Sequence, residues 1–275
     1  TDETINAGAD FSFFKGRLSG SLDVFQRTTK DLLGYTHPPI TSPVAQLATN
    51  IGSQHFRGIE LGINVDIIRK NGFSWDAYLN LSHLKRTWGD RDPNETLEKW
   101  AGAHDEVNAV YGWKTDGIFQ SREEVQNYKN EDGELYQPTS HPGNLKYVDI
   151  NKDGKLDGDD VVKLGCTDPK LNFGFGTTVR YKGFDLTIGT YGAIGMLTKD
   201  SWAYTNLEYM TKVNQSIYVK EAWSTFNPTG TRVGIKPDAG ISKPADDDYT
   251  MQKTWYLRLK NITLGYTIPK NWLVK

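Results

Sequence analysis

The sequence contains little that would support redox chemistry, zinc binding or nucleic-acid binding. The single cysteine, Cys166, excludes an intrachain disulfide framework, and no CxxC pair or Cys/His cluster has the spacing of a zinc site. Lysine and arginine number 32 against 34 aspartate and glutamate, so the net charge is −2. Without a basic field to hold a polyphosphate, we expect no nucleic-acid partner.

Long apolar runs and catalytic motifs are also missing. No stretch reaches the about 18 apolar residues that a transmembrane helix needs. This does not exclude membrane-spanning β-strands, because their alternation keeps the average hydropathy low. The 5 histidines are scattered, and the sequence has no HExxH pattern, no GxSxG elbow and no glycine-rich phosphate loop. We therefore predict that the chain is not an enzyme.

What the sequence does contain is a repeated alternation of apolar and polar residues with a period of two. In residues 58–67, Ile59 and Leu61 share one face with the following aliphatic residues, while Glu60 faces the other way. This period is typical of a β-strand with one apolar and one polar face. Such segments lie at 11–13, 18–28, 58–67, 73–82, 173–179, 184–188 and 255–268.

Tight turns and long segments alternate between these strands. The turns are Lys15-Gly16-Arg17, Lys70-Asn71-Gly72 and Tyr181-Lys182-Gly183. The long segments are 29–56, 87–170 and 193–254. Irregular loops of that length are uncommon in compact soluble domains, whereas short turns on one side and long loops on the other are typical of outer-membrane barrels.

The pattern predicts an all-β fold, a segment of a transmembrane antiparallel β-barrel with long extracellular loops. About seven strands would leave unpaired edges, which lipid does not tolerate, so further strands are needed for closure. The alternative is a soluble antiparallel β-protein with one wet face and one core face.

Motifs in the second half of the chain resemble a known family. Residues 111–120 read YGWKTDGIFQ, residues 147–154 read YVDINKDG, and residues 257–269 read LRLKNITLGYTIP. In order and spacing they are similar to the C-terminal third of SusC/RagA family TonB-dependent transporters, which import nutrients across Gram-negative outer membranes. With the earlier hairpins, the resemblance covers nearly the whole chain.

The resemblance implies a barrel of about 22 strands with a plugged lumen. Residues 1–275 would form a late portion of that barrel, and the plug, the TonB box, the early strands and the final strand pair would lie outside the chain. The implied partners are a SusD-like surface lipoprotein, the remaining barrel and plug, TonB through the absent N-terminal region, and outer-membrane lipid.

The resemblance also implies a function, which is TonB-dependent active import of oligomeric nutrients together with the SusD-like lipoprotein. Glycan oligosaccharides are the expected cargo. The alternatives are a peptide importer of the RagA type and a secreted calcium-dependent glycan-binding module. A dockerin-type module would carry two copies of the calcium repeat described next, whereas this chain has one. A glycosidase would cleave oligosaccharides, and we expect no such activity.

Residues 149–160 have the spacing of an EF-hand-type calcium loop. Oxygen side chains occupy positions 1, 3, 5, 9 and 12, and glycine stands at position 6. The predicted Ca²⁺ ligands are side chains of Asp149, Asn151, Asp153, Asp157 and Asp160 and the carbonyl of Lys155. Two features depart from the pattern, because position 12 is Asp rather than Glu and no helix is expected before the loop. The alternative is a solvated acidic turn.

Aromatic residues gather in the three long segments, where flat rings could stack on cargo. They are Trp88, Trp100, Trp113, Trp202, Tyr204, Tyr209 and Trp223. We predict that Trp202 and Tyr204 bind the cargo. The alternative for each ring is that it packs the loops against one another.

Overall fold

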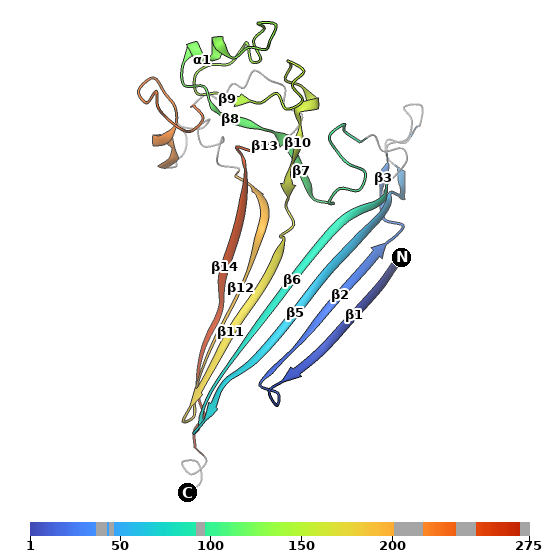
Figure 1. Cartoon of the computed structure of the whole chain (residues 1–275), viewed down its shortest axis with the longest axis vertical. Helices are drawn as coiled ribbons and strands as arrows, with labels where there is room; N and C mark the ends of the chain where they lie inside the picture. The colour runs from blue at the N-terminus through green and yellow to red at the C-terminus, as the bar shows by residue number, and fades with distance from the viewer. Residues whose placement is uncertain (37–42, 44–46, 92–96, 201–216, 235–245, 270–275) are drawn as a thin grey trace.

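The computed structural model describes residues 1–36, 43, 47–91, 97–200, 217–234 and 246–269. Its main element is a 7-stranded sheet with the strand order β1-β2-β5-β6-β11-β12-β14, in which all neighbours are antiparallel (Figure 1). The strands are β1 (Asp2–Phe13), β2 (Leu18–Thr29), β5 (Gly52–Lys70), β6 (Phe73–Arg91), β11 (Leu171–Tyr181), β12 (Phe184–Lys199) and β14 (Met251–Tyr266). The predicted all-β antiparallel fold is confirmed. Within the described residues the sheet is open, with β1 and β14 at its edges.

The register of the sheet gathers the apolar residues on one face. One row across the strands runs Leu22, Leu61, Leu81, Phe173, Gly192 and Leu257. Residues one position along each strand point to the opposite face, because the side-chain period is two. The sheet therefore has an apolar face and a polar face, as the alternation predicts.

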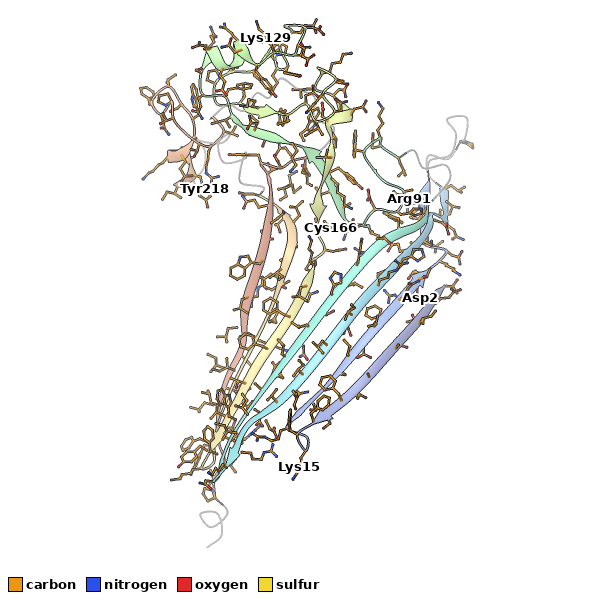
Figure 2. The ribbon with its side chains drawn as sticks, viewed as in Figure 1. Asp2, Lys15, Arg91, Lys129, Cys166 and Tyr218 are labelled. Carbon is orange, nitrogen blue, oxygen red and sulfur yellow. The ribbon has the colours of Figure 1, made fainter. Side chains whose placement is uncertain are left out.

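Tight turns join the strands at one end of the sheet (lower end of Figure 1). Asn71 and Gly72 have φ of 54° and 78°, and Lys182 and Gly183 have φ of 48° and 89°. Positive φ at both central residues is required by the type of hairpin turn whose twist matches that of the strands. Glycine and asparagine adopt it readily, and Lys182 adopts it in the second turn. Lys15 lies in the third such connection, at the same end as the other two (Figure 2).

Several strands are longer than the alternation indicates. β5 begins at Gly52, β6 continues to Arg91, and β12 continues to Lys199. The predicted bounds of the long segments, 29–56, 87–170 and 193–254, are therefore corrected by several residues at the strand ends. At the cap end of β6 both faces are polar, as at Lys85 and Arg86, so the backbone ladder continues after the apolar signal has ended. In β12 the alternation ends for a different reason, because residues 193–197 are apolar apart from Gly195 and show no period of two.

The two longest segments also form a packed unit rather than irregular loops. This unit, here called the cap module, comprises residues 97–170, 217–234 and 246–250, at the end opposite the tight turns (Figure 1). Its strands are β7 (Ala109–Trp113), β8 (Thr115–Ile118), β9 (Leu145–Tyr147), β10 (Val162–Cys166) and β13 (Asp246–Asp247), with helices α1 (Arg122–Asn127), η1 (Gly158–Asp160) and η2 (Ile217–Glu221). A separate hairpin pairs β3 (Leu33–Thr36) with β4 (Leu47–Asn50).

The cap module has a core of its own. The buried cluster consists of Trp113, Ile118, Leu145, Tyr147, Val161 and Val233. Trp113 and Tyr147 meet edge to face, with ring centroids 5.7 Å apart. β13 pairs in parallel with β7, so residues 246 and 247 complete a sheet begun by residues 109–113. Among the described residues no helix is long and apolar enough to span a membrane.

Candidate functional site

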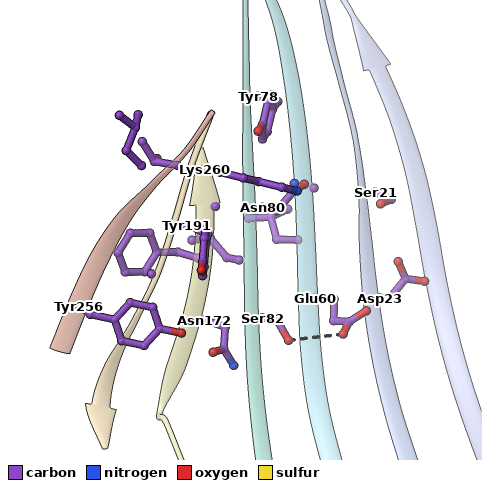
Figure 3. Close-up of a pocket in the computed structure, with 18 residues that line it drawn as sticks. Ser21, Asp23, Glu60, Tyr78, Asn80, Ser82, Asn172, Tyr191, Tyr256 and Lys260 are labelled. Carbon is purple, nitrogen blue, oxygen red and sulfur yellow. Dashed lines mark hydrogen bonds between the residues drawn. The ribbon is translucent and has the colours of Figure 1, made fainter. Parts of the chain in front are cut away.

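The polar face of the main sheet carries a cavity of about 900 Å³. Aligned side chains from four strands cross its floor, because Asp23 pairs with Glu60, Glu60 with Ser82, and Ser82 with Asn172 (Figure 3). The Ser82 hydroxyl donates to a Glu60 carboxylate oxygen at 3.4 Å. The row offers carboxylates, a hydroxyl and an amide to whatever occupies the cavity.

Glycines on the same face make room for larger side chains. A Cβ at Gly176 would lie 2.5 Å from the Tyr78 ring, so only glycine lets that ring cross the neighbouring strand. Tyr78 lies at one side of the cavity, while Tyr191 and Tyr256 lie at the other (Figure 3). The cavity wall therefore combines aromatic surface with hydrogen-bonding groups.

Sequence analysis did not single out these cavity residues. Glu60 appears there only as a polar residue between apolar strand positions, and Asp23 and Asn80 have the same place in the alternation of their own strands. The available signal was that all of them occupy the same phase of the alternation, which places them on one face. Their lateral alignment depends on the register between strands, which a single sequence does not reveal.

The predicted calcium loop folds around its own backbone. The Asp149 carboxylate accepts hydrogen bonds from the N–H groups of Lys152 at 2.6 Å and Gly154 at 2.8 Å. The Asp160 carboxylate accepts from the N–H groups of Ile150 at 2.7 Å and Asp157 at 3.0 Å. Gly154 has a φ of 85°, which provides the sharp turn expected of position 6.

The other predicted side-chain ligands behave in the same way. Asn151, Asp153 and Asp157 accept backbone hydrogen bonds from Asp153, Lys155 and Asp159, respectively. Among the described residues no group of three or more His, Cys, Asp or Glu side chains is placed to hold a metal ion. The hard-oxygen donors suit Ca²⁺ chemically, but in this conformation they serve the backbone. The calcium site stays a prediction.

The two ends of the loop differ in electrostatics. Asp160 is fully buried, and burial raises its pKa above the ordinary value although backbone N–H groups oppose the shift. The nearby Asp149 charge adds to the increase. For Asp149, burial also acts to raise the pKa, but hydrogen bonds from Gly154 and Tyr136 outweigh it and hold the pKa below its ordinary value.

The described aromatic residues of the long segments pack within the molecule. Trp113 is 1% exposed in the cap core, and the Trp223 indole N–H donates to the Gln120 carbonyl at 3.1 Å. Trp88 lies under the Arg91 guanidinium, 4.7 Å from ring centroid to guanidinium carbon. These rings therefore match the alternative in which aromatic residues pack the loops against one another. Trp202 and Tyr204, the predicted cargo ligands, lie outside the described residues.

The chain matches a known family model over residues 2–275, described as TonB dependent receptor-like, beta-barrel. It is 27% identical to TonB-dependent receptor P3 of Formosa agariphila, over 100% of this chain and 28% of that protein. It is also 27% identical to TonB-dependent receptor SusC of Bacteroides thetaiotaomicron, over 98% of this chain and 26% of that protein. The chain thus spans under a third of these curated relatives.

Solved structures show the same fold. The RagAB peptide transporter superposes with a TM-score of 0.74 at 18% identity, over 98% of this chain and 29% of that one. A RagAB peptide importer in its closed-closed state gives a TM-score of 0.72 at 21% identity. Proteins of this type reside in the outer membrane of Gram-negative bacteria and are receptors and transporters rather than enzymes. The sheet has one apolar and one polar face, and the family model matches residues 2–275, so the chain belongs to the TonB-dependent receptor-like β-barrel family.

Proposed function

We propose that this chain forms part of the wall and the outer cap of a TonB-dependent importer of oligomeric nutrients. The observation that carries the proposal is the two-faced sheet, in which the polar, cavity-bearing face lies opposite an apolar face suited to lipid. The tight turns then face the periplasm, and the cap module faces the outside. The edge strands β1 and β14 would pair with the remaining barrel, and the polar face would meet the plug or the cargo.

Glycan oligosaccharides are the proposed cargo. Support comes from the cavity wall, where tyrosine rings stand beside carboxylate, amide and hydroxyl groups. Such a mixture can stack on sugar faces and bond their hydroxyls. The similarity to SusC agrees with this choice. Peptides are the second candidate, because the RagAB structures are of a peptide transporter.

A SusD-like lipoprotein is the proposed lid over the cap module. Phe226 is 100% exposed, and Ile217 and Tyr218 are 72% and 47% exposed close to it in sequence. Large apolar side chains exposed on a surface that faces water can serve as contacts for a partner protein. Energy would reach the importer from TonB through the plug, which belongs to the rest of the protein.

The test uses the intact receptor and its lipoprotein in the native bacterium. Growth on defined oligosaccharides or on peptides as the sole carbon source distinguishes the two cargo classes, and calorimetry on the purified complex gives the affinity. Trp202→Ala with Tyr204→Ala should weaken cargo binding by about 1 kcal/mol if either ring is a stacking anchor. Unchanged affinity and growth would reject both residues as ligands.

The substitution Phe226→Ala tests the proposed contact between the cap module and the lipoprotein. It should reduce co-purification of the lipoprotein while leaving the cargo affinity of the receptor alone unchanged. Efficient uptake in cells that lack the lipoprotein would contradict the proposed division between wall and lid.

A further inference from the structure

A second hollow lies on the apolar face of the sheet, close to the cap end of β1, β2, β5 and β6. Its volume is about 510 Å³. The cross-strand register arranges its side chains in two rows. The row nearer the tight turns is Ala7, Val24, Ile59 and His83, and the row nearer the cap is Ile5, Gln26, Arg57 and Lys85. We call this hollow the outer notch.

The cap-side row places two cations directly opposite each other. Arg57 and Lys85 are register partners on neighbouring antiparallel strands, and both are exposed. Like charges in directly opposite positions destabilise a sheet. An anion between or above the two groups would reduce their repulsion.

The protein supplies little of that negative charge. The Arg57 guanidinium donates to the Gln26 side-chain oxygen at 3.1 Å, and no carboxylate of the described residues forms an ion pair with it. The Lys85 ammonium lies 3.9 Å from one oxygen of Glu106, and the other oxygen of Glu106 is held by Lys163. Farther along the same face, Lys30 is already paired with Glu3 at 2.7 Å. Arg57 is thus a cation without a countercharge in the described part of the chain.

The position of the outer notch along the membrane normal determines which part of the membrane surrounds it. From Phe73 at the turn to His83, β6 rises about 33 Å at about 3.3 Å per residue. With a strand tilt of about 40°, this corresponds to about 25 Å along the membrane normal, the height of the apolar band of an outer-membrane barrel. Arg57 and Lys85 lie one row beyond that band, where the outer-leaflet headgroups begin.

We propose that the outer notch binds a phosphorylated lipid of the outer leaflet. Arg57 presents a planar fork of donors that matches phosphate oxygens, and Lys85 adds a point charge beside it. One acyl chain would lie along Ile5, Val24 and Ile59, the large aliphatic residues of the lining. The inference rests on the proposed orientation in the membrane, with the cap outside.

The experiment uses the intact receptor, purified in detergent and titrated with bisphosphorylated lipid A, with binding followed by native mass spectrometry. Arg57→Gln with Lys85→Gln should weaken this binding by tenfold or more. The matched control is Arg69→Gln with Lys70→Gln, which removes the same two kinds of charge from the opposite end of the same hairpin. The control should bind lipid A as the unmodified receptor does. Equal binding by both double variants would overturn the proposal.

Further arms identify the source of the recognition. Lipid A without its phosphates should bind at least tenfold more weakly, and millimolar inorganic phosphate should not displace the intact lipid. Tight binding of the dephosphorylated lipid, or displacement by free phosphate, would show an acyl groove alone or a simple anion site, and either result overturns the proposal. Cargo affinity is measured on the same samples. If Arg57→Gln with Lys85→Gln loses lipid binding and retains cargo binding, the result supports the lipid site and shows that it is independent of the cargo site.

Discussion

The main sheet and the cap module place the same kinds of side chain in opposite environments. On the sheet, Leu264 and Leu257 are 73% and 51% exposed, whereas in the cap module Trp113 and Tyr147 are each 1% exposed. In the proposed orientation the sheet faces lipid, so large apolar residues belong on its outside, and the cap module faces water, so they belong inside. An exposed apolar side chain is therefore favourable on the main sheet and unfavourable on the cap module.

The two regions also differ in what holds them together. The sheet depends on continuous backbone ladders, with long strand pairs such as β5 and β6. The cap module has short strands of a few residues, and its cohesion comes from the buried cluster around Trp113. A substitution should therefore have effects that depend on region and face rather than on residue type alone.

The largest effect is expected from Trp113→Ala, which empties the centre of the cap core. Removing a buried tryptophan should destabilise the cap module by about 3–5 kcal/mol. Hydrogen exchange of the intact receptor should show loss of protection in the cap amides and unchanged protection in the sheet. Phe226→Ala is the control, because this ring is 100% exposed. Equal loss of protection in the sheet would contradict the separation of the two regions.

A smaller effect is expected from Leu79→Arg on the apolar face of β6. A charged side chain near the middle of the lipid should cost about 2–4 kcal/mol. Asn80→Arg is the matched control, because the next residue along the strand points into the polar cavity. Urea unfolding in lipid vesicles measures both variants. If the two substitutions were equally destabilising, the assignment of the faces would be wrong.

Calcium should stabilise the cap module and leave the sheet unaffected. With free Ca²⁺ at one hundred times its dissociation constant, the gain would be about 2.7 kcal/mol. Asp149→Ala should abolish the gain, whereas Asp132→Ala, an exposed acidic residue outside the loop register, should retain it. Thermal unfolding of the cap with Ca²⁺ and with a chelator gives the difference. The absence of any calcium-dependent shift in the unmodified receptor would exclude the site.

The smallest effect is expected from Lys163→Gln at the base of the cap. Lys163 is hydrogen-bonded to Asp105 and Glu106, and its contact lowers the pKa of Glu106. A lowered carboxylate pKa adds stability above the ordinary carboxylate range, and this stability is lost as pH falls through the lowered value. Removing Lys163 should cost about 1 kcal/mol or less at neutral pH, because the groups are partly exposed.

The measurement is cap stability against pH for both proteins. The difference between them should be present at neutral pH and vanish in acid below the lowered pKa of Glu106. A difference that persisted unchanged into strong acid would mean that Lys163 acts through packing rather than through charge.

The sequence was most informative where one physical constraint repeats along the chain. Alternation over 58–67 and 73–82 predicts β5 and β6, and Asn71-Gly72 predicts their turn, because strand period and turn conformation are local properties. The open all-β sheet and the resemblance to the family followed from these features and from the second-half motifs. Strand ends were missed where the alternation stops, either because both faces become polar, as at Lys85 and Arg86, or because successive residues are apolar, as in residues 193–197.

The cap module could not be predicted in the same way. Its strands are too short for periodicity, and their partners are distant, as in the pairing of Gly112 with Asp246. The cavity on the sheet has the same limit, since its row of polar groups depends on register across several strands. For the calcium loop, the spacing of the ligands is explicit in the sequence. Whether these groups bind a metal ion depends on a loop conformation that the spacing alone does not determine.

The parallel pairing of β13 with β7 also constrains the order of assembly. The cap sheet begins at residue 109, but its third strand arrives only with residues 246 and 247, immediately before β14 enters the main sheet. Contacts between such distant segments form late, because the intervening chain must first be brought together. The cap module therefore cannot reach its final packing until residues 246 and 247 are in place. A receptor whose folding stalls before residue 246 during biogenesis would have an incomplete cap module.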